Sequence, residues 1–448
     1  MRIQKLTYGI LFIFLLLIIR LSFITIGGKQ LKNEAFSQQT ANFYAGKCIY
    51  DSDMRELSNT TKMSHLIGYS WNGGAYGIKN TLKELSFVEE QNIFEITDVN
   101  GKTVSYAKKG NDYSGVMLTV NYHIQKIVEE VMDSCELTGA VVVVDTDTGG
   151  ISAMASRPDF QNSNVEQYFK SDNGELINRA TSQYNLGSIF KIVTAASALQ
   201  TSFSYEYMYN CTGKINIDGR DFLCNKEDGH GIITFNQGMA HSCNCLFYDF
   251  GIKLGYSNIK KYALDFGFGE QVLKINGYDE SRGNLPSDVL SNQGLANVAI
   301  GQGEILATPV QVADMMCTIA NDGIRKQLML IGGIVDKNGN VAKIQPTETG
   351  RIISVDTARN IKQMLFEAVQ YGTGVSAKPN NSSAVGKTGT AETGWTRNGE
   401  TMTHGWFAGY FPAEKPRYVC VVLAENGGYG SDSASPVFKE IAKKILDL

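Results

Sequence analysis

Hydrophobic and polar positions change their spacing several times along the chain, and each spacing predicts a different element. Residues 6–26, "LTYGILFIFLLLIIRLSFITI", are mainly apolar, and with Arg20 reaching toward an interface they are long enough to span a bilayer. Residues 139–156, "GAVVVVDTDTGGISAMAS", are two apolar runs around a turn sequence, which predicts a β-hairpin. Residues 404–412 and 417–426, "HGWFAGYFP" and "RYVCVVLAEN", predict two neighbouring strands.

Helical patterns lie between and beside these strands. Residues 118–135 pass from a strand-like start into a helix, residues 184–200 predict an apolar helix, and a further helix is expected from Pro436. Strands at both ends of this region with helices between them predict an α+β fold, with one antiparallel sheet flanked by helices. Residues 30–135 contain short strand-like runs without candidate chemistry, so we expect a small N-terminal supporting domain there and a larger domain over 136–448.

The N-terminal segment predicts the location of the chain. Arg2 and Lys5 precede the apolar run, which favours a cytoplasmic N-terminus. No small-x-small cleavage site follows the run, so residues 1–29 are expected to form a short cytoplasmic tip and an uncleaved, single-pass transmembrane anchor. The remaining domains would then lie outside the cell membrane.

Composition excludes some functions. The net charge is −4 and charged residues make up 19% of the chain, so no basic surface for nucleic acid is expected. Eight cysteines are too few for a disulfide framework, although Cys211 and Cys224 flank a polar loop and could either pair or stay reduced. Six cysteine and histidine residues lie close together in the sequence, but their spacing matches no usual zinc pattern, so we expect neither a metal nor a cofactor; they are Cys211, Cys224, His230, His241, Cys243 and Cys245.

The start of the apolar helix carries candidate chemistry. Ser188 and Lys191 are three residues apart and therefore share one face of that helix, and Gly187 permits a sharp turn just before them. A lysine that is removed from water loses proton affinity and can act as a base toward a serine hydroxyl. One such pair alone would be better explained as a helix cap and a structural lysine. Two other pairs, Ser105 with Lys108 and Ser257 with Lys260, lie in polar surroundings and are expected at the surface.

Two further motifs follow the Ser188–Lys191 pair along the chain. Ser242-Cys243-Asn244 and then Lys387-Thr388-Gly389-Thr390 come after Ser188, and this order is the signature of serine acyltransferases that react with penicillin. We expect Ser188 as the nucleophile, Lys191 as its base and Ser242 as a proton relay. Asn244 would hold the substrate amide and Lys191, whereas Cys243 would point away and pack. From the last motif, Lys387 supplies positive charge, Thr388 and Thr390 bind a carboxylate, and Gly389 allows a substrate strand to approach closely.

With these motifs in place, the chain from residue 139 onward resembles the transpeptidase domain of penicillin-binding proteins, and the part before it resembles the pedestal of their class B type. The likeness extends to the segments "NRATSQYNLGSIFK", "HGIITFNQGMAHSCNCLF", "IGQGEILATPVQVADMMCTIANDG", "YGTGVSAK" and "GKTGTAETGWTRNGETMTHGWFAGYFP". The resemblance implies a penicillin-binding transpeptidase and β-lactamase-like fold, with the backbone N–H groups of Ser188 and Thr390 forming an oxyanion hole. Leu186 and Ile189 stand where the family has proline and threonine, and Ala45 and Ser52 stand where its pedestal has arginines.

The resemblance implies a peptidoglycan D,D-transpeptidase that cross-links stem peptides and is acylated by β-lactam antibiotics. A membrane-embedded glycan polymerase is the partner that the family implies. A D,D-carboxypeptidase would use the same residues with water as the acceptor. A serine β-lactamase or a penicillin-sensing binding module fits the anchor and the pedestal less well.

Overall fold

The protein is described by a computed structural model over residues 48–57, 63–88, 93–97, 103–108, 113–201, 203–289, 291–380, 383–397 and 399–448. The predicted membrane anchor, residues 1–29, lies outside these residues. Within the described ranges, no helix combines the length and the apolar character that crossing a membrane requires.

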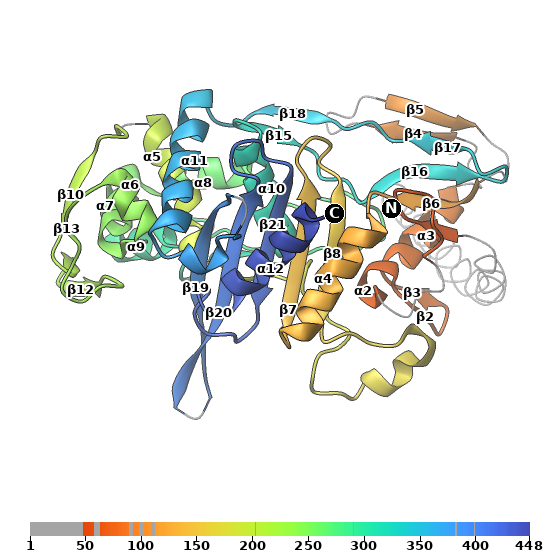
Figure 1. The fold of residues 1–448 in the computed structure, drawn as a ribbon, viewed down its shortest axis with the longest axis horizontal. Helices are drawn as coiled ribbons and strands as arrows, with labels where there is room; N and C mark the ends of the chain where they lie inside the picture. Colours follow the sequence, from red (N-terminus) through yellow and green to blue (C-terminus); the bar gives the residue numbers. More distant parts are fainter. Residues whose placement is uncertain are drawn as a thin grey trace, which may run out of the picture.

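A five-stranded antiparallel sheet forms the centre of the larger region, in the order β19-β20-β21-β7-β8 (Figure 1). The hairpin predicted at 139–156 and the neighbouring strands predicted near 404–426 are both confirmed. Val421 lies opposite Val142, so the sheet joins the beginning and the end of this region, as predicted. The strands are β7 Gly139–Asp145, β8 Ile151–Arg157, β19 Val385–Arg397, β20 Glu400–Phe411 and β21 Tyr418–Ala424.

Helices cover both faces of this sheet because successive side chains of each strand point to opposite sides. Helices α4 (Tyr122–Ser134) and α12 (Ala434–Leu446) pack on one face, where the Phe438 ring lies 4.5 Å from the Phe407 ring. Helix α10 (Pro309–Ala320) packs on the other face, against a core that contains Trp406. Trp406 and Phe407, which are neighbours on β20, are both fully buried, one on each face.

Next to the sheet lies a helical region that is built around α5 (Lys191–Thr201) (Figure 1). Residues 191–198 of α5 are all buried, as the apolar sequence predicted. A short 3-10 turn, η3 (Gly187–Ile189), precedes it. The neighbouring elements are β10 Met208–Cys211, β11 Lys214–Ile217, β12 Arg220–Leu223, β13 Gly231–Thr234, α6 Phe235–Ala240, α7 Asn244–Leu254, α8 Tyr256–Asp265, α9 Asn292–Ala299 and α11 Val355–Gln370.

The N-terminal region contains a mixed sheet in the order β1-β6-β16-β17. Strand β1 pairs parallel with β6, and β16 pairs antiparallel with both β6 and β17. Strands β16 and β17 come from within the range predicted as the second domain, so this sheet combines distant parts of the chain. The described elements of this region are β1 Cys48–Tyr50, α2 Ser64–Ile67, β2 Ser70–Trp71, β3 Gly74–Ala75, α3 Ile78–Val88, β4 Ile93–Thr97, β5 Thr103–Lys108, β6 Tyr113–Leu118, β16 Ile331–Asp336 and β17 Val341–Lys343.

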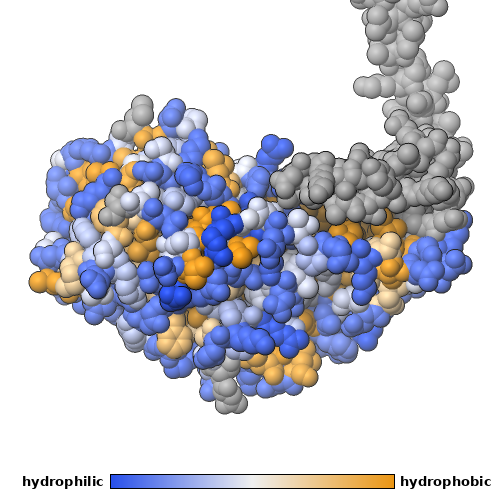
Figure 2. Space-filling view, turned by 90° about the horizontal axis from the view of Figure 1, so that it is seen from above, coloured by the Kyte–Doolittle hydropathy of each residue, from blue (hydrophilic) through white to orange (hydrophobic). Residues whose placement is uncertain are grey.

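Short elements connect these parts, and polar side chains lie over much of the surface. On the face shown in Figure 2, hydrophobic residues form separate patches among hydrophilic ones. The connecting elements are η2 Asn162–Tyr168, β9 Tyr184–Asn185, β14 Leu306–Ala307, β15 Ile324–Lys326, β18 Glu348–Arg351 and η4 Val375–Ala377.

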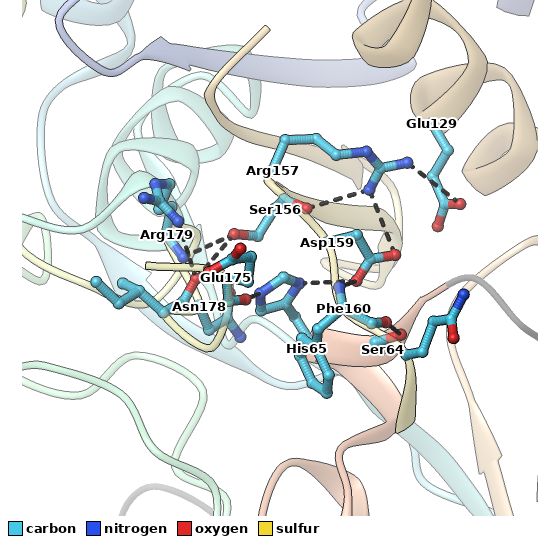
Figure 3. Close-up of polar contacts among 12 residues, drawn as sticks. Ser64, His65, Glu129, Ser156, Arg157, Asp159, Phe160, Glu175, Asn178 and Arg179 are labelled. Atoms are coloured by element: carbon cyan, nitrogen blue, oxygen red, sulfur yellow. Dashed lines mark hydrogen bonds and ion pairs between the residues drawn. The ribbon is translucent and has the colours of Figure 1, made fainter. Parts of the chain in front are cut away.

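Polar contacts join the N-terminal region to the larger domain (Figure 3). His65 Nε2 lies 2.6 Å from the Glu175 carbonyl oxygen, and His65 Nδ1 lies 3.4 Å from a carboxylate oxygen of Asp159. Asp159 in turn faces Arg157, with 3.8 Å between the nearest charged atoms. Since His65 and Arg157 are largely buried, these contacts fix α2 against the end of β8.

Candidate active site

The three predicted motifs meet where the helical region adjoins the edge of the sheet. Ser188 lies in η3 and Lys191 begins α5, while Ser242 and Asn244 lie at the N-terminus of α7. The Lys387–Thr390 segment lies on β19, which is an edge strand of the sheet. The structure thus brings together all of the residues for which chemistry was predicted.

A chain of short contacts connects the candidate nucleophile to the buried lysine. Ser188 Oγ lies 3.0 Å from Ser242 Oγ, which lies 3.1 Å from Lys191 Nζ. A hydroxyl group can donate one hydrogen bond and accept others, so Ser242 can pass a proton between its two neighbours. The path from Ser188 to Lys191 therefore runs through Ser242, which gives the predicted relay a definite position.

The surroundings of Lys191 suit a base. Its Nζ donates to the Ser242 carbonyl oxygen at 2.8 Å and to Asn244 Oδ1 at 2.6 Å. With these two acceptors occupied, a neutral amine presents its lone pair to the Ser242 hydroxyl. Complete burial lowers the pKa of Lys191 to about 8, because a charged ammonium is disfavoured away from water. Lys191 can therefore exchange a proton near neutral pH.

A second buried lysine lies on the strand side of the site. Lys387 Nζ donates to the Thr388 carbonyl oxygen at 3.0 Å and lies 3.4 Å from the hydroxyls of both Thr388 and Thr373. Burial, and after it the nearby charge of Lys191, lowers the pKa of Lys387 well below its ordinary value. Lys387 thus orients hydroxyl groups along β19, whereas its lowered pKa disfavours the positive charge that the sequence predicted for it.

Two glycines allow the nucleophile turn to lie directly against β19. Gly187 has a φ of 54°, and a Cβ atom at this position would lie 2.3 Å from the Thr390 carbonyl oxygen. A Cβ atom on Gly389 would lie 2.8 Å from the Leu186 carbonyl oxygen. A larger residue at either position would push Ser188 away from the strand, so the glycines set the width of the site.

The turn at 371–374 also contributes a residue to the site. Thr373 Oγ1 lies 2.7 Å from Thr388 Oγ1, and the Thr373 N–H donates to the Ala240 carbonyl oxygen at 3.0 Å. Thr373 thereby links the segment before Ser242 to β19. The sequence did not single out Thr373, because no local pattern distinguishes it from other threonines in turns.

Replacing Thr373 by valine tests this link. The change keeps the side-chain shape but removes the hydroxyl that orients Thr388, and a lost hydrogen bond of about 1 kcal/mol corresponds to a roughly fivefold effect. We expect acylation by a fluorescent penicillin to slow by roughly fivefold to tenfold, measured as a second-order rate constant. Thr401→Val, at an exposed position on β20, should leave that rate constant unchanged. Equal rates for wild type and Thr373→Val would contradict this role.

Other sequence predictions have clear outcomes. Ser257 is exposed on α8 and Lys260 bonds to backbone carbonyls, so this serine–lysine pair lies at the surface as predicted. His404 accepts a hydrogen bond from the backbone N–H of Asn426 and so braces the turn after β21. The Ser105–Lys108 side chains lie outside the described residues.

The cysteines contain a further unexpected arrangement. All eight are free thiols, so the structure does not pair Cys211 with Cys224. Cys243 is fully buried, as predicted for the residue between Ser242 and Asn244. The spacing of six cysteine and histidine residues in the sequence predicted no metal site. Four of the six nevertheless lie close together in the structure; they are Cys211, Cys224, His230 and Cys243.

This geometry can perform acyl transfer. The site offers a serine hydroxyl connected to a base, and next to it an edge strand with threonine hydroxyls. An extended peptide can add to an edge strand through backbone hydrogen bonds, which would place its carbonyl group near Ser188. The described site residues therefore combine a candidate nucleophile with an edge strand to which an extended, peptide-like substrate could add.

Comparisons with known proteins agree with this arrangement. Residues 139–443, more than half of the chain, match the family described as the penicillin-binding protein transpeptidase domain. Stage V sporulation protein D of Bacillus subtilis is 28% identical, with 94% of this chain and 68% of that protein aligned. Peptidoglycan D,D-transpeptidase PbpA of Mycobacterium tuberculosis is 27% identical over 75% of this chain and 74% of its own length.

Solved structures give the same result. The D,D-transpeptidase domain of a peptidoglycan glycosyltransferase from Eggerthella lenta superimposes with a TM-score of 0.74 and 26% identity. The superposition covers 90% of this chain and 98% of that one. The overall fold is therefore shared well beyond the three motifs.

Proposed function

Because the chain belongs to the penicillin-binding protein transpeptidase family, we propose that it is a peptidoglycan D,D-transpeptidase that works through an acyl-Ser188 intermediate. One observation carries the proposal most directly, namely the contact chain from Ser188 Oγ through Ser242 Oγ to Lys191 Nζ beside an edge strand. A D,D-transpeptidase requires these two parts, an activated serine and a groove for a stem peptide.

The reaction follows from the positions of the groups. The terminal carboxylate of a donor stem peptide binds the hydroxyls of Thr388 and Thr390, and its scissile carbonyl lies at Ser188. As Ser188 Oγ attacks that carbon, its proton moves through Ser242 to Lys191. The peptide C–N bond breaks, the departing D-Ala amine takes up the proton, and an ester to Ser188 remains. The amine of a second stem then attacks the ester, forms the cross-link and returns the serine hydroxyl.

The oxyanion of the intermediate and the amide of the substrate each need hydrogen-bond partners in the site. The backbone N–H groups of Ser188 and Thr390 stabilise the negative oxygen that develops during attack. Asn244, held by Lys191 at 2.6 Å, orients the amide of the donor peptide with its side chain. In this arrangement, hydroxyl, amide and amine groups of the chain itself carry the reaction.

The location and the partner form part of the same proposal. Residues 1–29 anchor the chain as a single transmembrane helix with the N-terminus in the cytoplasm, and the catalytic domain lies outside the membrane. The support is the apolar run from Leu6 to Ile26 that follows Arg2 and Lys5. Cross-linking joins glycan strands that another active site must polymerise, so a membrane glycan polymerase is the expected partner.

The test uses the purified full-length chain and uncross-linked peptidoglycan strands with pentapeptide stems. A transpeptidase releases D-Ala and produces cross-linked dimers in equal amounts, whereas a D,D-carboxypeptidase releases D-Ala without dimers. Mass spectrometry of digested strands measures both products. Ser188→Ala is the control for chemistry at this site, and D-Ala release without dimers would replace the transpeptidase proposal by a carboxypeptidase. Addition of a β-lactam should stop both products.

A further inference from the structure

A cluster of four metal-binding side chains lies directly behind the catalytic residues. Its members come from separate elements, since Cys211 ends β10, Cys224 follows β12, His230 precedes β13 and Cys243 caps α7. Their ligand atoms all lie within 4.8 Å of one another. We refer to Cys211, Cys224, His230 and Cys243 as the cysteine–histidine cluster.

The distances within the cluster match a tetrahedral metal site. Cys224 Sγ lies 3.8 Å from Cys243 Sγ and 3.6 Å from His230 Nδ1. Around a tetrahedral zinc ion, bond lengths of about 2.3 Å to sulfur and about 2.0 Å to nitrogen place two sulfurs about 3.8 Å apart and sulfur and nitrogen about 3.5 Å apart. A disulfide would need a sulfur–sulfur distance of about 2.05 Å instead.

The surrounding backbone is arranged to bring these side chains together. Strand β10 pairs with β13 so that Cys211 lies opposite Gly231, the residue after His230. The Cys224 N–H donates to the Gly213 carbonyl oxygen at 2.8 Å, which folds the β11–β12 hairpin back toward Cys211. A Cβ atom on Gly229 would lie 2.2 Å from the Cys211 carbonyl oxygen, so the loop before His230 has no room for a larger residue.

We propose that the cysteine–histidine cluster binds one Zn²⁺ ion as a structural site. Three thiolates and one imidazole are a usual ligand set for structural zinc, and four protein ligands leave no open position for substrate. The three cysteines are buried, with exposed fractions of 2%, 7% and 0% for Cys211, Cys224 and Cys243. Binding releases the thiol protons to water, and no change in oxidation state is involved.

The position of Cys243 suggests what the ion does. Cys243 lies between Ser242 and Asn244, both of which accept a hydrogen bond from Lys191. Ser242 has a φ of 57°, a left-handed conformation that residues other than glycine rarely adopt. Fixing the next residue to a metal, together with β10, β12 and β13, would hold this conformation. The zinc ion is therefore a positioning element for the proton relay, and it does not touch the substrate.

Metal analysis of the full-length chain, purified under reducing conditions without chelators, tests the proposal. We expect about one zinc per chain in the wild type and less than about a tenth of that in Cys224→Ser and His230→Gln. Cys317→Ala, in α10, and Cys420→Ala, in the central sheet, remove buried thiols outside the cluster and should keep their zinc. Zinc loss in both of these variants would contradict the ligand assignment.

Two further measurements use wild-type protein, so they test the zinc site even if a cluster variant fails to fold. Wild-type protein loaded with Co²⁺ should show the intense visible bands of a tetrahedral ion and thiolate-to-cobalt charge transfer. Removal of zinc by a chelator should slow labelling by a fluorescent penicillin by at least about tenfold, and added ZnCl₂ should restore it. The proposal is overturned if the wild type neither contains zinc nor takes up added Zn²⁺, or if mass analysis finds a Cys224–Cys243 disulfide in its place. Penicillin labelling of zinc-free protein would leave the proposed function intact while overturning the positioning role.

Discussion

Replacement of Ser188 by alanine is expected to abolish covalent labelling of the protein by a fluorescent penicillin. The β-lactam carbonyl needs an oxygen nucleophile, and Ser188 is the hydroxyl that connects through Ser242 to the buried Lys191. Removing a nucleophile that forms a covalent intermediate lowers the rate by at least about 10³-fold. Labelling time courses on a gel, with wild type and variant side by side, measure the loss.

The sequence supplies a matched control for this experiment. Ser257 also stands three residues before a lysine, but it is exposed on α8. Ser257→Ala should label at the wild-type rate, and retained labelling in Ser188→Ala would remove Ser188 from its proposed role. The lifetime of the wild-type adduct adds a second result, since a β-lactamase would lose the label within seconds and consume the drug.

The rate of acylation is expected to rise with pH through about 8 and then level off. Acylation needs the neutral amine of Lys191, and burial lowers the pKa of this group to about 8. Below that pH the ammonium form dominates, so the rate falls about tenfold for each pH unit; above it the amine is already neutral. Stopped-flow labelling between about pH 6 and about pH 10 gives the profile.

Variants of Lys191 separate its proton transfer from its charge. Lys191→Arg keeps a positive charge but cannot lose a proton in this range, so we expect a loss of about 10²- to 10⁴-fold and no rise near pH 8. Lys260→Met, in the surface serine–lysine pair, should keep both the rate and the profile. A wild-type rate without pH dependence near 8 would exclude Lys191 as the base. Near-wild-type labelling by Lys191→Arg would exclude it as well.

Local patterns predicted which residues meet at the candidate active site, because these residues cluster in short motifs. Ser188 and Lys191 lie on one turn of chain, and their burial follows from the apolar residues of α5. The hairpin at 139–156 was also predictable, since alternating apolar runs around a glycine turn specify strands without information from elsewhere. In both cases, the residues that determine the local structure lie within about twenty positions of one another in the sequence.

Two side-chain arrangements that depend on the packing of distant elements were not predicted. Thr373 acts through Thr388, and their contact at 2.7 Å arises only when α11 is packed beside β19. The cysteine–histidine cluster was missed for the same reason. Spacing rules for zinc assume ligands on one or two local loops, whereas Cys211 and Cys243 come from a strand end and a helix cap. Only the folded arrangement of four elements makes their thiols neighbours.

The mixed sheet of the N-terminal region has a consequence for synthesis of the protein. Strand β6 ends at Leu118, but its partner β16 begins at Ile331. At about 5–20 residues per second, a ribosome needs roughly 10 to 40 seconds to make the intervening chain. During this interval one edge of β6 lacks the strand that covers it in the folded protein, and the central sheet still waits for β19, β20 and β21. The nascent chain therefore passes through a stage with an uncovered strand edge, during which pairing with other chains competes with folding.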